Sequence, residues 1–342
     1  MRRVNPVYQK ITQILSSNTL PLYDVFFSLL NDTSEVLENE KTSKDGYRPV
    51  ASDGNAGGFL DFHKDQLPLV VIPDFHARPY FLQNILDYKI FDDISVFEAL
   101  DSGRLRLLSV GDILHTEMGT RERWMAAEAE FNNEIFTGPA MSAEMQEGLS
   151  LWCALMELKK NYPEYVHILK GNHENILNET GGGDFAFRKL ADEGEMCRCF
   201  VQEFYGDDIL YLMNCIEQSL PLYYFGKRCS VSHAEPMRAF TRDELINART
   251  YPGVVKGLIW TNNGEAAEGS AVGTVKNLFD REKEEVPEGY VSLGGHRPVT
   301  GNYKSLQDGK YIQIHNPARQ NIAFVQSDKS FNPDEDLLEV KK

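Results

Sequence analysis

Residues that commonly bind metal ions follow four apolar runs of the chain and one Gly-Gly turn. They are Asp74 and His76, Asp112, Asn172, His233 and His296. Residues two apart on an extended segment face the same way, so Asp74 and His76 can hold one ion together. Gly111 precedes Asp112 and lets the backbone turn sharply, which directs the carboxylate into a crevice. Carboxylate, amide and imidazole ligands suit Mn, Fe, Zn or Ni.

Two divalent ions at such a site would meet only two carboxylates, those of Asp74 and Asp112. Four positive charges less two negative ones leave about two positive charges, which can hold a phosphate group. A pair of ions about 3.5–4 Å apart can also clamp a phosphate and lower the pKa of a bridging water. These residue types therefore predict a two-metal site for phosphate chemistry.

Taken singly, each of these residues has a structural interpretation. Asp74 or Asp112 could cap a following helix, and Asn172 could be a left-handed turn residue. A lone histidine after a strand is more often a hydrogen-bonded residue than a ligand. The chain has eight histidines, however, and five of them (76, 115, 173, 233 and 296) fall at these positions. We therefore favour the joint, functional interpretation.

The elements that must position these residues are short buried strands. Apolar, β-prone runs are predicted as strands at 67–72, 105–110, 165–169, 222–225, 229–232 and 290–293. A hairpin is expected at 303–306 and 311–314, around the turn signal Asp308-Gly309. Open α/β sheets bind ligands at the carboxyl ends of their strands, so we expect the candidate ligands to meet at one edge.

Helical patterns occupy much of the remaining chain. They are expected as two helices within 1–45, then at 80–86, 117–148 with a break near 137–139, 151–160, and 185–217. We predict a helical N-terminal accessory segment over 1–58 and one catalytic domain over 59–330, with a helical insert at 117–148. The polar tail 331–342 is expected to be frayed.

Composition excludes several classes of partner. The net charge of −16 argues against a nucleic-acid surface, which depends on Lys and Arg meeting phosphates. No apolar run approaches the roughly 18 residues of a membrane span, and no apolar signal region follows the first two arginines. The five cysteines form no CxxC pair, so we expect a reduced, cytoplasmic protein. The sequence sets no expectation for the oligomeric state.

The same residues resemble the calcineurin-like metallophosphoesterases, and more closely their phosphoprotein (Ser/Thr) phosphatase branch. That family is marked by GDxHG, GDxVDRG, GNHE, a strand ending in HGG, and a later RAH or GH. This chain has PDFHA at 73–77, GDILHTE at 111–117, GNHE at 171–174, SHAE at 232–235 and GGHRP at 294–298. The flanking segments agree as well, so that the resemblance covers roughly residues 67–325.

The resemblance implies an α/β fold, a four-layer αββα sandwich, with the site at the carboxyl edge of its sheets. Carried over to this chain, it implies that Asp74, His76 and Asp112 hold a first metal ion. Asp112 bridges to a second ion, whose remaining ligands are Asn172, His233 and His296. The family's GNHE histidine protonates the leaving oxygen, a role that falls here to His173.

Two positions depart from the GDxVDRG motif. Where the family has an Asp that supports the catalytic histidine and an Arg that binds phosphate, this chain has His115 and Thr116. A neutral His115 can still hydrogen-bond His173, so we predict a catalytic pair, although an imidazole does not raise the pKa of its partner as a carboxylate does. In addition, HGG is replaced by His233-Ala234-Glu235.

The phosphate-binding cation must then come from elsewhere in the chain. From their proximity in the sequence to the ligand motifs, Arg78 and Arg297 are predicted to bind the substrate, with Arg121 and Arg123 as further candidates.

The predicted function is that of a dinuclear metal-dependent phosphoesterase, a hydrolase of the metallophosphoesterase type with manganese among its candidate ions. It would hydrolyse a phosphomonoester, of a small molecule or a phosphoprotein, by attack of a metal-bridging hydroxide. Two alternatives stay open: a nucleotide or dinucleoside-polyphosphate hydrolase, and a catalytically inactive metal-binding scaffold that recognises a phosphorylated partner. Glu174 is expected to orient its neighbours or to form a structural salt bridge, His315 to be structural, and segment 117–148 to roof the site.

Overall fold

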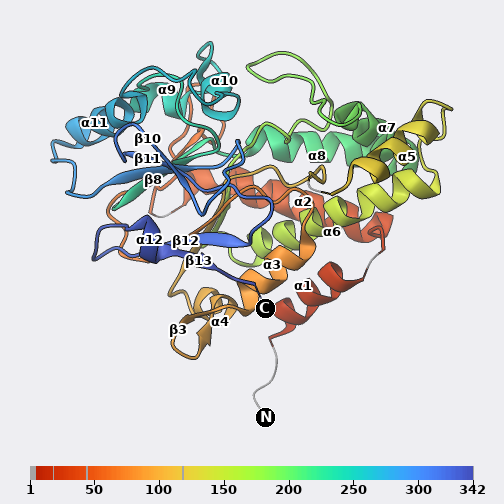
Figure 1. The fold of residues 1–342 in the computed structure, drawn as a ribbon, viewed down its shortest axis with the longest axis horizontal. Coiled ribbons are helices and arrows are strands. Elements are labelled where there is room, and N and C mark those ends of the chain that lie inside the picture. Colours follow the sequence, from red (N-terminus) through yellow and green to blue (C-terminus); the bar gives the residue numbers. More distant parts are fainter. Residues whose placement is uncertain (1–4, 18, 44, 118, 342) are drawn as a thin grey trace.

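Two mixed β-sheets face each other in the protein, and helices cover the outer face of each (Figure 1). The computed structural model describes residues 5–17, 19–43, 45–117 and 119–341. One sheet has the strand order β13-β12-β2-β5-β6, and the other has the order β1-β7-β8-β9-β11-β10. Their strands are β1 (Phe59–Phe62), β2 (Leu69–Ile72), β5 (Arg106–Ser109), β6 (Val166–Ile168), β7 (Tyr223–Gly226), β8 (Cys229–Ser232), β9 (Val291–Gly294), β10 (Lys304–Leu306), β11 (Tyr311–Gln313), β12 (Asn321–Val325) and β13 (Leu337–Glu339).

The helices fall into two groups on opposite sides of the sheets (Figure 1). Eight helices accompany the β2-containing sheet: α1 (Pro6–Ser16), α2 (Tyr23–Asn39), α3 (Pro79–Asp87), α4 (Val96–Asp101), α5 (Arg121–Phe131), α6 (Pro139–Asn161), α7 (Glu193–Tyr205) and α8 (Asp207–Ser219). The other sheet is covered by α9 (Arg242–Ile246), α10 (Val254–Ile259) and α11 (Ser270–Glu282). A short helix, α12 (Pro333–Asp336), precedes β13, and a small hairpin of β3 (Lys89–Phe91) and β4 (Ile94–Ser95) follows α3.

Side chains along each strand alternate between two buried layers. In β2, Val70 and Ile72 pack beneath the helices, whereas Leu69 and Val71 belong to the core between the two sheets. Strand β7 behaves likewise, since Tyr224 lies in the core between the sheets and its neighbours lie under α9–α11. Strands that are buried on both faces read as continuous apolar runs, which is why the sequence revealed them. The predicted four-layer αββα sandwich is confirmed.

Strand direction explains why the candidate ligands can meet. Strands β2, β5 and β6 are parallel neighbours in one sheet, and β8, β9 and β11 are parallel neighbours in the other. Their carboxyl ends therefore lie at a common edge of each sheet.

The N-terminal helices are integrated with the rest of the chain through a buried ion-pair network. Glu40, just after α2, forms ion pairs with Arg48 and with Lys159 of α6, and all three side chains are buried. The Lys159 ammonium also donates to the carbonyl oxygens of Pro163 (2.7 Å) and Val166 (2.8 Å), so the network reaches β6. Burial opposes ionisation of Glu40, but the charges of Lys159 and Arg48 hold its pKa well below the usual value.

Three sequence expectations differ from the structure. The tail is ordered rather than frayed, because β13 pairs antiparallel with β12 and Val340 is buried. The helix predicted to end at 148 and the helix predicted at 151–160 are one element, because α6 runs without interruption from Pro139 to Asn161. The break predicted near 137–139 lies just before α6. Residues 185–192 are irregular, and the helical region predicted from 185 begins with α7.

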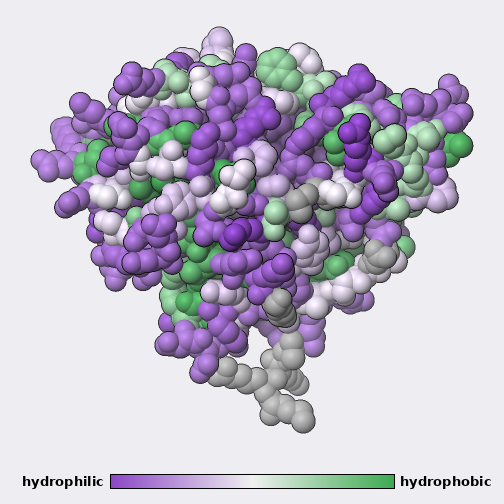
Figure 2. Space-filling model, in the orientation of Figure 1, coloured by the Kyte–Doolittle hydropathy of each residue, from purple (hydrophilic) through white to green (hydrophobic). Residues whose placement is uncertain are grey.

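The surface shows no membrane-spanning element among the described residues, where no helix combines the length and the apolar character that a span requires. The face seen in Figure 2 is mainly hydrophilic, with small hydrophobic patches between polar side chains.

Candidate metal centre

All six predicted metal ligands lie together, buried, at the shared edge of the two sheets. Each follows the carboxyl end of a strand: Asp74 and His76 follow β2, Asp112 follows β5, Asn172 follows β6, His233 follows β8 and His296 follows β9. Several of these ends turn through left-handed backbone, with φ of 45° at His76, 52° at Asp112 and 65° at His296. Such conformations are costly for non-glycine residues and cluster at functional sites.

One half of the cluster is centred on the amide oxygen of Asn172. Asn172 Oδ1 lies 2.9 Å from His233 Nε2 and 2.9 Å from His296 Nδ1. His233 Nε2 is also 3.5 Å from Asp112 Oδ2. Donor atoms on a common ion with bonds of about 2.1 Å lie roughly 3 Å apart, so these four side chains can share one ion.

Asp74 and His76 each adjoin Asp112, but in two separate groups of ligand atoms. His76 Nε2 lies 3.9 Å from Asp112 Oδ2, and Asp74 Oδ1 lies 3.4 Å from His233 Nδ1. Asp74, Asp112 and His233 offer ligand atoms that are all within 4.8 Å of one another, and His76, Asp112 and His173 do the same. Asp112 belongs to both groups, which agrees with a bridging position, although neither group is the predicted set of Asp74, His76 and Asp112.

The charge of the site favours a bound cation. Burial, with the charges of Asp74 and Glu174 beside it, raises the pKa of the Asp112 carboxyl well above its usual value. Within the described ranges, no Lys or Arg side chain forms an ion pair with Asp74 or Asp112. Buried carboxylates without a protein cation are expensive, and divalent ions relieve that cost. The donor set therefore fits divalent metal ions.

Glu174 joins the two loops that carry the central ligands. Its Oε2 accepts hydrogen bonds from the backbone N–H groups of Gly171 (2.7 Å) and Asp112 (2.8 Å), and its Oε1 accepts from that of Ile113 (2.7 Å). The loops approach so closely that a Cβ atom at Gly111 would lie 2.4 Å from the Gly171 nitrogen. Of the two predicted roles for Glu174, the structure supports the orienting one.

His173 faces the ligand cluster and contacts His115 behind it. Its Nε2 lies 3.6 Å from Asp112 Oδ2, its backbone N–H donates to Asp112 Oδ1 (3.0 Å), and its Nδ1 lies 3.1 Å from His115 Nδ1. Burial, with His76 nearby, lowers the pKa of His115 to about 3, so His115 is neutral near pH 7. Phe187 covers the pair, with its ring centroid 3.7 Å from that of His173.

The two arginines predicted to bind substrate differ in their surroundings. Arg78 is buried, and its guanidinium donates to the backbone carbonyl oxygens of Phe75, Asp74, Pro317 and Arg319. We therefore assign Arg78 a structural role in place of the predicted phosphate contact. Arg297, directly after His296, is half-buried and donates to Asn262 Oδ1, so one side chain contact orients it beside the cluster.

The further arginine candidates lie outside this constellation. Arg123 is engaged by Glu144 (2.9 Å) and Glu147 (3.0 Å), and Arg121 is exposed on α5. From the same segment, Trp124 packs behind the site, 6.2 Å from the His115 ring. The segment 117–148 thus contributes to the support of His115.

Three residues near the cluster were not predicted as site residues. Lys189 forms an ion pair with Glu117, and burial, with Arg297 close by, lowers the pKa of its ammonium. Glu117 in turn lies near His76 and His315. His315 lies two residues after the end of β11, so the strand-end pattern that identified the other candidate ligands also applied to it. Lys189 lies in an irregular loop, where no sequence pattern distinguished it.

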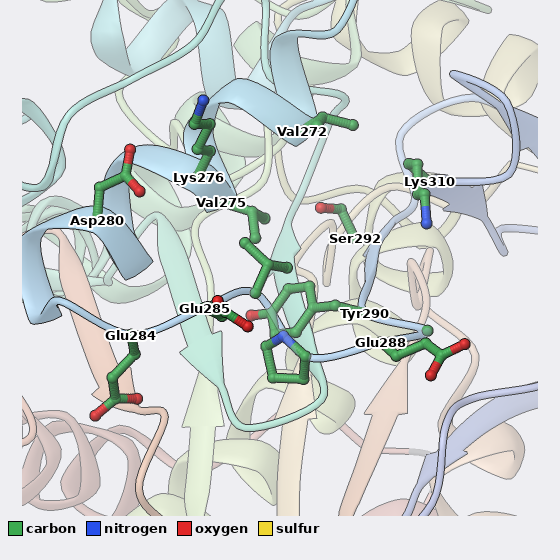
Figure 3. Close-up of a pocket in the computed structure, with 13 residues that line it drawn as sticks. Val272, Val275, Lys276, Asp280, Glu284, Glu285, Glu288, Tyr290, Ser292 and Lys310 are labelled. Carbon is green, nitrogen blue, oxygen red and sulfur yellow. The ribbon is translucent and has the colours of Figure 1, made fainter.

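A separate cavity of about 540 Å³ lies between α11 and β9 (Figure 3). Figure 3 shows Val275 and Tyr290 at its apolar centre, with Asp280, Glu284 and Glu288 around the rim. None of its lining residues belongs to the ligand cluster, so it has no direct part in the chemistry described above.

Comparison with solved structures identifies the fold. A protein serine/threonine phosphatase from Saccharomyces cerevisiae matches with a TM-score of 0.60, over 97% of this chain and 94% of that chain, at 13% sequence identity. The chain has the fold of this phosphatase. A cold-active protein-tyrosine phosphatase from a psychrophilic Shewanella matches less closely, with a TM-score of 0.45 over 80% of each chain at 13% identity. No family model and no curated protein matches the sequence.

Proposed function

We propose that the protein is a metal-dependent phosphoesterase that hydrolyses phosphomonoesters with two divalent ions, chosen from Mn, Fe, Zn and Ni. The observation that supports this most strongly is the convergence of six buried O- and N-ligands from two sheets on one edge, with His173 facing them. The phosphatase fold supports the same class of activity. Catalysis is assigned to residues 59–330, with 1–58 as an accessory segment packed on α6 and α8.

The ligands divide between two ions that share Asp112. Asp74, His76 and Asp112 would hold the first ion, and Asp112, Asn172, His233 and His296 the second. When bound, such ions neutralise the phosphate and lower the pKa of a bound water. Asn172 contributes a neutral oxygen, so the ligands add little negative charge and the site keeps a positive excess for the substrate.

His173 would hold the proton that the leaving oxygen takes up. Its Nε2 faces the cluster, while Nδ1 is in contact with His115 Nδ1, 3.1 Å away. Only one of the two Nδ1 atoms can carry a proton in that contact. When His115 Nδ1–H donates to His173 Nδ1, the one ring proton of neutral His173 is on Nε2. His115 is therefore a positioning residue that selects the tautomer of His173.

Phosphate binding is assigned to Lys189 and Arg297. Both carry a positive charge beside the cluster, and Lys189 is half-exposed, so a substrate can reach it. We propose a phosphorylated small molecule or protein as the partner. A cytoplasmic location belongs to the proposal, because all five cysteines are free thiols, as is usual in a reducing compartment.

Turnover of p-nitrophenyl phosphate by protein stripped of metal and reloaded with Mn²⁺ tests the activity. We expect no turnover by the stripped protein, and two bound ions with restored turnover after reloading. Asp112→Asn is expected to lose both ions and the activity, since it removes the shared carboxylate. Two bound ions without turnover of small esters, dinucleoside polyphosphates or phosphopeptides would contradict the proposal and favour a binding scaffold.

Substitution of Lys189 by alanine is expected to raise KM for p-nitrophenyl phosphate about tenfold, with a smaller change in kcat. A hydrogen bond to a charged group contributes about 1.5–3 kcal/mol, and about 1.4 kcal/mol corresponds to a factor of ten. Steady-state kinetics in Mn²⁺ measure the effect. Arg188→Ala is the matched control, because Arg188 precedes Lys189 in the same loop but pairs with Asp192. An unchanged KM in Lys189→Ala would show that phosphate is bound elsewhere.

A further inference from the structure

A third group of ligand-type side chains adjoins the first metal position. His76, Glu117 and His315 offer ligand atoms that all lie within 4.8 Å of one another. Glu117 Oε2 is 3.4 Å from His76 Nε2 and 3.1 Å from His315 Nε2. His315 is fully buried and the Glu117 side chain is 11% exposed, so neither is an ordinary surface residue.

The ring of His315 brings one nitrogen to this group and the other to Asp74. Its Nε2 lies 3.1 Å from Glu117 Oε2, and its Nδ1 lies 3.0 Å from Asp74 Oδ2 without a hydrogen bond between them. Among the described residues the Nδ1 atom has no hydrogen-bond partner, whereas Nε2 is hydrogen-bonded to Glu117 and borders the space between Glu117 and His76.

We propose that Glu117 and His315 are ligands of the first metal ion, in addition to Asp74, His76 and Asp112. This inference rests on the proposed function, since it concerns the same pair of ions. His76 belongs both to the predicted ligands of the first ion and to the new group, because its Nε2 atom lies near both Asp112 and Glu117. The first ion would thus have more protein ligands, and more carboxylates, than the second.

The additional carboxylate changes the charge available for substrate. Three carboxylates against two divalent ions leave about one positive charge at the site, rather than about two. Lys189, which pairs with Glu117, restores a positive charge at the same position. The inference therefore accounts for a lysine beside the cluster. In the family motif the positive charge comes from an arginine, at the position where this chain has Thr116.

Binding of Mn²⁺ alone to metal-free protein tests the inference without reference to turnover. Titration calorimetry and metal analysis after dialysis would be applied to the full chain, to Glu117→Gln and to His315→Gln. We expect two ions on the unaltered protein, and on each variant a tenfold or greater loss of affinity for one ion with the other unchanged. Glu122→Gln is the control, because it removes the same charge from an exposed position on α5 and should bind like the unaltered protein.

Loading with Co²⁺ provides a second readout. Visible absorption of Co²⁺ depends on the number and kind of its ligands, so the spectrum of the first ion should change in Glu117→Gln and not in Glu122→Gln. Because His315 is fully buried, His315→Gln could fail to fold; circular dichroism checks this, and Glu117→Gln then decides alone.

The outcomes separate the inference from the proposed function. If Glu117→Gln binds two ions with unaltered affinity and spectrum, Glu117 and His315 only pair with their protein neighbours, and the inference is overturned while the proposed function stands. If the unaltered protein binds no ion, the proposed function fails and the inference fails with it.

Discussion

Replacing His173 with asparagine is expected to lower kcat for phenyl phosphate by about 10²–10⁴-fold while both metal ions stay bound. His173 Nε2 faces the ligand cluster 3.6 Å from Asp112 Oδ2, and asparagine has no group there that transfers a proton. The hydrogen bond from its backbone N–H to Asp112 is unaffected by the side chain, so metal binding should persist. Steady-state kinetics and metal analysis on the same sample measure both quantities.

The leaving group supplies a sharper check on the role of His173. A general acid matters most when the departing oxygen is strongly basic, so the loss should be much smaller for p-nitrophenyl phosphate than for phenyl phosphate. His63→Asn makes the same exchange far from the cluster, where His63 contacts Asp61, and should leave both rates unchanged. Equal losses for the two esters would contradict the assignment of His173 as the acid.

Replacing Glu40 with glutamine is expected to lower the free energy of unfolding by about 3–5 kcal/mol, because removing one partner of a buried ion pair leaves the other charge uncompensated. In Glu40→Gln, the charges left without an opposite charge are those of Lys159 and Arg48, which are both fully buried. Urea denaturation of the metal-free protein at pH 7 measures the effect. Glu38→Gln is the matched control, since Glu38 is exposed and pairs only with Lys41 among the described residues; its change should stay within about 0.5 kcal/mol.

The pH dependence of the unfolding free energy provides an independent test of the role of Glu40. The pKa of Glu40 is held well below its usual value in the folded protein, so the unfolded chain binds a proton more readily. Its contribution is fully present above about pH 5 and is lost as the pH falls toward the folded-state pKa. The difference in unfolding free energy between the unaltered protein and Glu40→Gln should therefore shrink with acid. A constant difference between pH 7 and pH 3 would contradict it.

The sequence predicted that the candidate ligands would meet at one edge because the signals for that arrangement are local. A buried strand followed at once by Asp, His or Asn can be recognised within a few residues, and parallel strands bring such ends to one edge. The interactions of Arg78 are not local: two of its acceptors, the carbonyls of Pro317 and Arg319, lie more than 200 residues away. Lys189 was missed for the same reason, because its partner Glu117 comes from another loop.

The fold was predictable where strands are buried on both faces and less so at the edges of the sheets. Strand β13 has three residues in a polar segment, and its pairing with β12 gives it a regular conformation that propensity alone does not predict. Strand β1 directly follows a glycine-rich loop, so no clear signal in the sequence marks where the strand begins. Long helices such as α6 were found, but a change of composition within one helix was mistaken for a boundary.

The carboxylate of Glu174 has a consequence for how the proposed metal ions would bind. Because it already holds the backbone of Gly171, Asp112 and Ile113 together, the two loops need no ion to adopt their shape. Binding free energy is then not consumed in ordering the chain, unlike in domains that fold only around their metal. If the proposed ions bind, they would leave and be replaced while the scaffold persists, so we expect the metal in the purified protein to follow the supply in the growth medium.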